Sequence, residues 1–208
     1  MDKTKIKICG IKRPEDVEIL NRFCPDYAGF VFWEKSKRYI DPKRAAQLRR
    51  GIAQEIQTAA VLVDMPVREA ARLFQLGIVS VLQLHGHEDR AYIAELRALT
   101  GPEAKIWKAV MVRTAEDIAA AEDSPADMVL LDNGYGTGQA FDWNSTSGLK
   151  RPFFLAGGLN AENVRAAIGH FHPFGVDVSS GVETEGFKDM DKAAAFIRAV
   201  RDCSRMEE

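Results

Sequence analysis

The chain has 208 residues, of which 46% are apolar, and its 28 basic and 30 acidic side chains give a formal net charge of −2 at pH 7. This length and apolar content fit one folded domain, 1–208, and exclude wholesale disorder. The near-neutral charge argues against a sequence-independent nucleic-acid binder, which needs a basic surface. Since no apolar run approaches the roughly 18 residues of a membrane span, we expect no membrane partner.

The cysteines and the N-terminus favour a cytoplasmic protein. Cys9, Cys24 and Cys203 form neither a CxxC pair nor a metal-binding spacing. A sparse, odd number of cysteines is typical of reduced thiols in the cytosol. The N-terminus begins with charged residues and leads into a strand-like run, so we expect no targeting segment. We expect no metal.

Short β-rich runs alternate with amphipathic runs along the chain. The predicted strands are Lys5–Cys9, Tyr27–Phe32, Thr58–Val63, Val79–Leu84, Lys105–Val110, Met128–Asp132, Pro152–Ala156 and Gly175–Val178. The predicted helices are Pro14–Arg22, one that starts at Asp41-Pro42, Pro66–Leu76, Glu88–Leu99, Thr114–Glu122, a short one in Asp142–Leu149, Asn160–Ile168 and Asp189–Arg201.

This alternation implies a parallel sheet covered by helices. We predict an α/β fold, a compact (β/α)₈ TIM barrel in a single domain, with shorter loops than the typical barrel of about 250 residues. An open doubly wound sheet is the alternative. Such a sheet does not need eight strands, and it usually has a glycine-rich turn after the first strand, where Cys9-Gly10-Ile11-Lys12 stands instead.

Polar side chains stand where the predicted strands end, which is where a barrel carries its chemistry. Alternation along each strand separates helix-facing from inward-facing residues. In the first strand Ile6 and Ile8 share the helix-facing side, so the strand-end thiol points inward. By the same alternation the inward-facing residues at the rim are Cys9, Gln83, His85, Asp132 and Asp177.

Two small-residue turns follow the last two strands. Gly157-Gly158 comes after the seventh strand and Ser180-Gly181 after the eighth. In barrels these two loops often form a phosphate site from backbone N–H groups, and glycine lets the backbone approach the anion. The pair therefore predicts a phosphorylated small-molecule ligand.

Each of these residues alone also has a structural interpretation. A strand-end cysteine is often a small buried apolar residue, and a glycine pair often only makes a turn. An aspartate such as Asp132 often caps the next turn, His85 alone is more typical of a hydrogen-bonded structural residue, and Asp177 alone fits an ion pair with an interior lysine. Their joint occurrence at one rim favours the functional interpretation.

A series of segments in chain order carries a family resemblance. They are Lys7–Ile11, Gly29–Phe32, Ser36–Tyr39, Gln83–Gly86, Leu130–Asp132, Gly136–Gly138, Phe141–Trp143, Leu155–Asn160 and Gly175–Glu183. Together they resemble the phosphoribosylanthranilate isomerases of tryptophan biosynthesis. The resemblance implies a cofactor-free (β/α)₈ barrel.

The resemblance implies an Amadori rearrangement of N-(5-phosphoribosyl)anthranilate to 1-(o-carboxyphenylamino)-1-deoxyribulose 5-phosphate. Asp132 matches the family's general acid and Cys9 its general base. Arg38 matches the arginine that pairs with the anthranilate carboxylate, a role that suits a guanidinium. Asp177 and His85 are expected to contact the substrate, and Gly157, Gly158, Ser180 and Gly181 its phosphate.

The chemistry requires a protonated Asp132 and a thiolate at Cys9. We expect the pKa of the Cys9 thiol to lie below the free value of roughly 8.5, helped by the interior Lys7 and by a cationic Schiff base. The sequence departs from the family pattern in Tyr135–Gly138, which has one glycine where two are common and looks one residue short. It departs again at Trp33–Lys35, where proline is frequent.

Two other functions remain open. A different phosphosugar isomerase, including a bifunctional barrel that also acts in histidine biosynthesis, typically has an aspartate where Cys9 stands. A non-catalytic phosphate-ligand binding protein would bind without turnover. A monomer and a homodimer both fit this fold.

Overall fold

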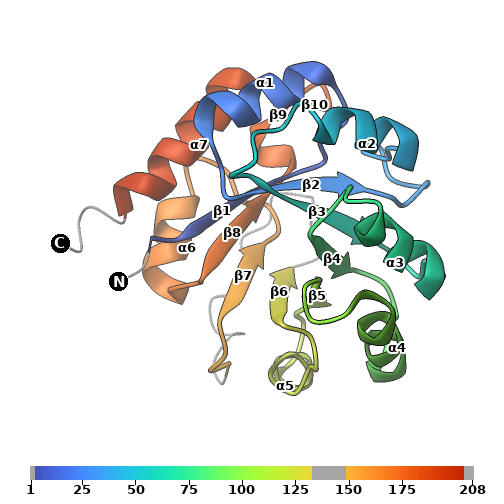
Figure 1. Ribbon diagram of the computed structural model, residues 1–208. Helices are drawn as coiled ribbons and strands as arrows, with labels where there is room; N and C mark the ends of the chain where they lie inside the picture. Colours follow the sequence, from blue (N-terminus) through green and yellow to red (C-terminus); the bar gives the residue numbers. More distant parts are fainter. Residues whose placement is uncertain (1–2, 133–148, 204–208) are drawn as a thin grey trace.

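A computed structural model describes residues 3–132 and 149–203, and its parallel strands close into a barrel (Figure 1). The closure is direct, because β8 pairs with β1 in parallel, with Lys5 opposite Gly175 and Ile8 opposite Val178. The strands are β1 Lys5–Cys9, β2 Tyr27–Val31, β3 Gln57–Leu62, β4 Val81–Leu84, β5 Lys105–Met111, β6 Met128–Asp132, β7 Phe153–Ala156 and β8 Gly175–Val178. The predicted TIM barrel is confirmed, and the open sheet is wrong.

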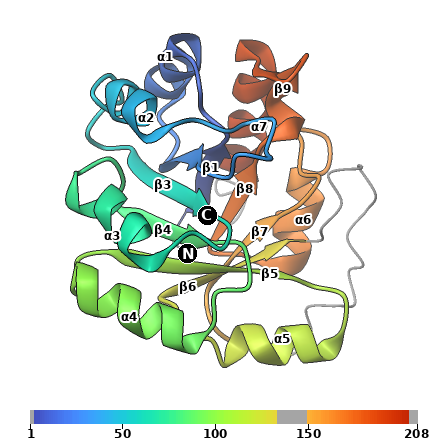
Figure 2. The same ribbon diagram turned by 90° about the vertical axis from the view of Figure 1, so that its right-hand side faces the viewer.

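The helices lie around the outside of the strands, as the two ribbon views show (Figures 1 and 2). They are α1 Pro14–Phe23, α2 Pro42–Arg49, α3 Val67–Gln75, α4 Arg90–Thr100, α5 Ala115–Glu122, α6 Val164–Phe171 and α7 Met190–Cys203. Several begin where the sequence supplies a cap. Asp41 accepts a hydrogen bond from the backbone N–H of Arg44, and Asp89 accepts one from Tyr92.

Two apolar layers hold the barrel together. Ile8 and Val176, on the outer side of their strands, belong to the core between strands and helices. Trp107 and Phe154 point inward and stack with ring centroids 4.6 Å apart. Because these large rings fill the barrel interior, the room for a ligand lies at the carboxyl ends of the strands.

The largest shift from a predicted boundary is at α6, which begins at Val164 and not at Asn160. The Asn160 side chain accepts hydrogen bonds from the backbone N–H groups of Glu162 and Asn163, so it closes a turn before the helix. The helix predicted in Asp142–Leu149 lies outside the described residues except for Leu149, which is not helical. The loop Tyr135–Gly138 also lies outside them.

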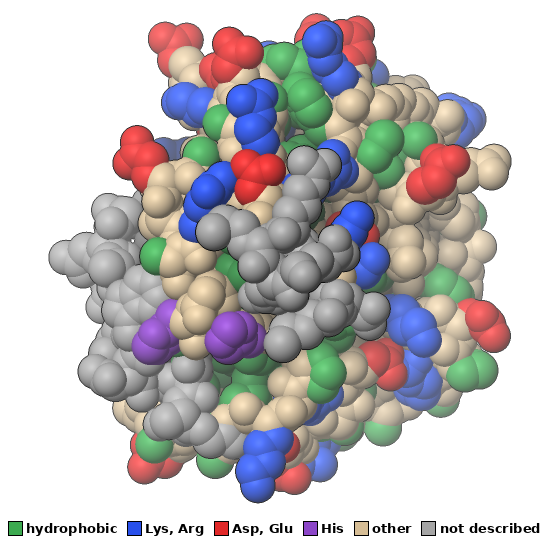
Figure 3. Space-filling model, turned by 90° about the vertical axis from the view of Figure 1, so that its left-hand side faces the viewer, with side chains coloured by type: hydrophobic (Ala, Val, Ile, Leu, Met, Phe, Trp, Pro, Cys, Tyr) green, Lys and Arg blue, Asp and Glu red, His purple; other side chains and the backbone are tan. Residues whose placement is uncertain are grey.

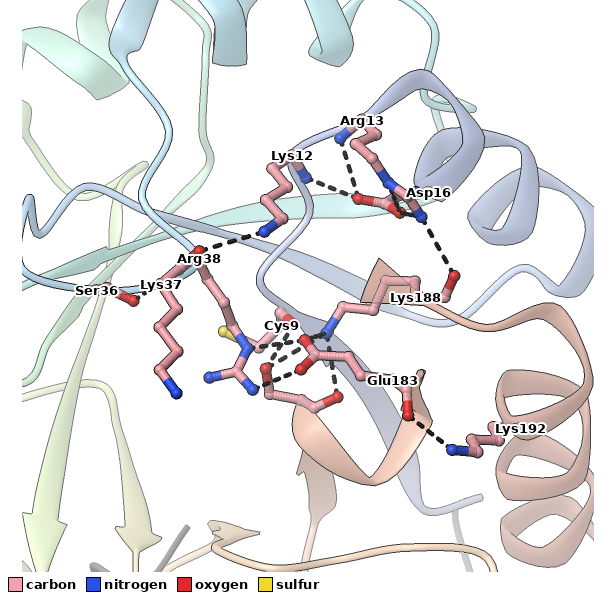
Figure 4. Close-up of polar contacts among 11 residues, drawn as sticks. Cys9, Lys12, Arg13, Asp16, Ser36, Lys37, Arg38, Glu183, Lys188 and Lys192 are labelled. Atoms are coloured by element: carbon pink, nitrogen blue, oxygen red, sulfur yellow. Dashed lines mark hydrogen bonds and ion pairs between the residues drawn. The ribbon is translucent and has the colours of Figure 1, made fainter. Parts of the chain in front are cut away.

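A small element after β8 was not predicted. It consists of a 3₁₀ turn, η1 Ser180–Val182, and a two-stranded antiparallel sheet of β9 Glu183–Thr184 and β10 Phe187–Lys188. Strands of two residues are too short to show periodicity, which explains the omission. This element places Glu183 and Lys188 beside the carboxyl end of β1 (Figure 4).

The surface carries both signs of charge. On the face shown in Figure 3, acidic and basic side chains are intermixed. This agrees with the formal net charge of −2. In the part of the chain that the structure describes, every helix is too short or too polar to span a bilayer.

Candidate active site

A cavity of about 460 Å³ opens at the carboxyl ends of the barrel strands. Its volume lies within the range of roughly 300–1,000 Å³ that is typical of small-molecule sites. The cavity brings together most of the residues predicted from the sequence. Those that line it are Cys9, Arg38, His85, Asp132, Gly157, Gly158, Asp177 and Ser180.

One predicted site residue, Gly181, does not line the cavity. It lies in the loop after β8. A Cβ atom at this position would lie 1.9 Å from the carbonyl oxygen of Leu159. Gly181 therefore lets the loops after β7 and β8 pack backbone against backbone, which holds Gly157, Gly158 and Ser180 at one side of the cavity.

Cys9 ends β1 as a buried free thiol at the cavity wall. Burial raises the pKa of the Cys9 thiol, although the cations of Lys7 and Lys188 act in the opposite direction. The expected pKa below the free-thiol value is therefore wrong for the unliganded protein. Desolvation outweighs the nearby lysines, which the sequence alone could not show.

The raised pKa predicts how Cys9 reacts with iodoacetamide. Because only the thiolate is alkylated, the alkylation rate of Cys9 should still be rising with pH at pH 9. Peptide mass spectrometry of a Cys24→Ser/Cys203→Ser variant measures this rate for Cys9 alone. A rate already constant above pH 8 would show that the thiolate predominates there.

Lys7 and Asp177 form a buried ion pair inside the barrel. Lys7 Nζ lies 2.7 Å from Asp177 Oδ2, and the Lys7 side chain has no exposed surface. Burial opposes the charge on Lys7, but Asp177 and Cys9 together outweigh burial and raise the pKa of the lysine. Asp177 Oδ1 and Gln83 Oε1 are buried acceptors with no hydrogen-bond partner among the described residues. Both residues line the cavity, so both can accept hydrogen bonds from a ligand.

Asp132 and His85 face each other across the rim from β6 and the end of β4. His85 Nε2 lies 3.6 Å from Asp132 Oδ2, and both side chains are partly exposed to the cavity. Burial lowers the pKa of His85, although the Asp132 carboxyl opposes this. The imidazole is therefore neutral at pH 7.

Arg38 enters the cavity wall from the loop after β2 (Figure 4). Glu183, which has no predicted role, binds Arg38 directly, and Lys188 binds Glu183. Glu183 accepts hydrogen bonds from Arg38 Nε at 2.7 Å and from Nη2 at 2.6 Å. Lys188 Nζ lies 2.7 Å from the Glu183 carboxylate. Glu183 belongs to a segment that carries the resemblance, but nothing in the sequence showed that it meets Arg38.

Within the described residues, 3–132 and 149–203, the structure groups no three His, Cys, Asp or Glu side chains in an arrangement that could hold a metal ion. What the cavity offers is a thiol, a carboxyl, an arginine and two small-residue loops. These groups can bind an anionic ligand and move protons on it.

Comparison with known proteins gives the family that the sequence motifs resemble, the phosphoribosylanthranilate isomerases. A sequence model described as N-(5′-phosphoribosyl)anthranilate (PRA) isomerase matches residues 6–199. A Thermoanaerobacter sp. (strain X514) protein named N-(5′-phosphoribosyl)anthranilate isomerase is 43% identical over 95% of this chain and 98% of its own. One of the same name from Clostridium acetobutylicum (strain ATCC 824) is 40% identical over 95% of this chain and 98% of its own.

Solved structures agree. The Thermotoga maritima phosphoribosylanthranilate isomerase has a TM-score of 0.87 and 34% identity, over 96% of this chain and 99% of its own. A phosphoribosylanthranilate isomerase in complex with reduced 1-(o-carboxyphenylamino)-1-deoxyribulose 5-phosphate has a TM-score of 0.84 and 33% identity, with the same coverage. This chain therefore belongs to the N-(5′-phosphoribosyl)anthranilate isomerase family.

Proposed function

We propose that the protein isomerises N-(5-phosphoribosyl)anthranilate to 1-(o-carboxyphenylamino)-1-deoxyribulose 5-phosphate, the third step of tryptophan synthesis from chorismate. The observation that carries this proposal is that Cys9, Asp132 and Arg38 line one cavity together with the two small-residue loops. The relatives' names support the same reaction. The free thiols support a cytoplasmic location, and the fold suits a monomer or a homodimer.

The first step is ring opening. Asp132 donates its proton to the furanose ring oxygen as the bond from that oxygen to C1′ breaks. The lone pair of the anthranilate nitrogen forms the C=N bond, which produces a cationic Schiff base. Asp132 is the group suited to this step, because it is an acidic side chain in the cavity wall, whereas Asp177, the other one, is paired with Lys7.

The second step removes the proton from C2′. The Cys9 thiolate takes this proton, and the electron pair of the C–H bond forms the C1′=C2′ bond of an enolamine and neutralises the nitrogen. The enolamine then gains a proton at C1′ and loses its hydroxyl proton, which gives the ketone. The cationic Schiff base favours the thiolate at the moment when it is needed, and this offsets the burial that raises the pKa of Cys9.

The remaining residues bind the substrate. Arg38 pairs with the anthranilate carboxylate, and the loops with Gly157, Gly158, Ser180 and Gly181 hold the phosphate. Asp177 Oδ1 accepts a hydrogen bond from the amine or a hydroxyl group of the substrate. A neutral His85 contacts the substrate without adding a positive charge beside the cationic intermediate.

Arg38→Met should raise KM for the anthranilate-bearing substrate by about 10- to 100-fold, because a charge-assisted bidentate contact contributes about 1.5–3 kcal/mol. Initial rates over a range of substrate concentrations measure this. An unchanged KM in the folded variant would remove Arg38 from the site.

The reaction is tested by identifying its product. The purified protein is incubated with substrate labelled with ¹³C at C2′, and the product is followed by NMR. We expect the C2′ signal to move from the alcohol region to the ketone region. Binding of the substrate without this change would favour a non-catalytic phosphate-ligand binding protein. Turnover of a two-phosphate aminoimidazole substrate would favour the bifunctional barrel.

A further inference from the structure

We propose that Glu183 is a positioning residue for the anthranilate carboxylate: it holds Arg38 by one edge of the guanidinium and thereby presents the other edge to the substrate. This inference rests on the proposed function. Glu183 itself is not in the cavity wall, whereas Arg38 is. It therefore acts on the substrate through Arg38.

The hydrogen bonds between the two residues define which edge is used. Glu183 occupies the edge formed by Nε and Nη2, at 2.7 and 2.6 Å. A guanidinium has a second two-hydrogen edge, formed by Nη1 and Nη2. A planar aromatic carboxylate can pair with that second edge in the same bidentate way.

The charges around Glu183 leave the arginine attractive to an anion. If Arg38 and Glu183 stood alone, the two charges would cancel. Lys188 adds a second cation, whose Nζ lies 2.7 Å from Glu183 Oε1 and whose side chain is 1% exposed. Two cations around one carboxylate have a net charge of +1, which a substrate carboxylate can neutralise.

Contacts with the backbone at Gly10, Ser179 and Cys9 also hold the group of Arg38, Glu183 and Lys188 in place. A Cβ atom on Gly10 would lie 2.4 Å from Arg38 Cδ, so the arginine stem packs directly against the glycine. Lys188 Nζ also donates to the Ser179 carbonyl oxygen at 3.1 Å, and Ser179 Oγ donates to the Cys9 carbonyl oxygen at 3.0 Å. The cluster of Arg38, Glu183, Lys188 and Ser179 thus ties the carboxylate-binding arginine to the strand that carries the base.

Glu183→Gln tests the proposal, because it keeps the shape of the side chain and removes its charge. The experiment measures kcat and KM with N-(5-phosphoribosyl)anthranilate. It also measures Kd, by calorimetry, for 1-(o-carboxyphenylamino)-1-deoxyribulose 5-phosphate and for the same compound without the carboxyl group. Glu185→Gln is the matched control, since Glu185 is an exposed glutamate two residues along the chain.

For Glu183→Gln we expect KM and the Kd of the carboxylated ligand to rise about tenfold or more, and kcat to change less than about threefold. The Kd of the carboxyl-free ligand should stay unchanged. In an Arg38→Met background, Glu183→Gln should add no further loss of affinity for the carboxylated ligand. Glu185→Gln should behave like the native protein.

Equal effects on both ligands, or no effect on either, would overturn the proposal. Thermal unfolding checks that the variants fold. If Glu183→Gln does not fold, Glu183→Asp provides the same comparison, because it keeps the charge beside Lys188 but is too short to reach both Arg38 nitrogens. Failure of the native protein to convert N-(5-phosphoribosyl)anthranilate would instead contradict the proposed function.

Discussion

Cys9→Ala should lower kcat by about 10²- to 10⁴-fold, the usual contribution of a positioned general base. The variant lacks the group that takes the C2′ proton, and water in the cavity would be a much weaker base. The change removes one sulfur atom from a buried position, so the barrel should still fold. Initial rates at saturating substrate give kcat, and thermal unfolding gives the stability.

Cys24→Ala is the matched control for this experiment. Cys24 is an exposed free thiol just after α1 and is not in the cavity wall. Its replacement should leave kcat and KM at the native values. Full activity of purified Cys9→Ala would remove Cys9 from the role of base.

Asp132→Asn should lower kcat by a similar factor, about 10²- to 10⁴-fold, because an amide cannot supply the proton that opens the ribose ring. The amide has nearly the same shape as the carboxyl group, so substrate affinity should be retained. We expect the Kd of 1-(o-carboxyphenylamino)-1-deoxyribulose 5-phosphate to change less than about threefold. Initial rates and calorimetry on the same preparation separate these two effects.

Asp191→Asn is a suitable control, because Asp191 is an exposed carboxyl group in the first turn of α7. It should leave both quantities unchanged. If Asp132→Asn weakened ligand binding as strongly as it lowered kcat, Asp132 would be a binding residue and another group would be the acid.

The barrel was predictable because the strand signals are strong and regular. Alternation in β1 assigned Ile6 and Ile8 to the outer core and Cys9 to the interior, and the structure confirms this. The same rule predicts His85, Asp132 and Asp177 at one rim, and all three line the cavity. Successive side chains of a strand point to opposite faces of the sheet, so the sequence predicts which ones face the barrel interior whatever the length of the connecting helices.

Other features depend on contacts that a single sequence does not encode locally. The meeting of Arg38 with Glu183 joins residues 145 positions apart. It depends on β9 and β10, which are too short for a periodic signal. The direction of the Cys9 pKa shift depends on how burial compares with the effect of two lysines, which only the folded arrangement decides. The later start of α6 depends on the hydrogen bonds of one asparagine side chain.

The most direct measurement is the fluorescence decay of freshly generated N-(5-phosphoribosyl)anthranilate in a single turnover, with protein in excess. The native protein, Cys9→Ala and Asp132→Asn are compared side by side. A base at Cys9 and an acid at Asp132 predict fast decay with the native protein and decay near the uncatalysed rate with each variant. No decay with a well-folded native protein, or native-like decay with either variant, would contradict this assignment.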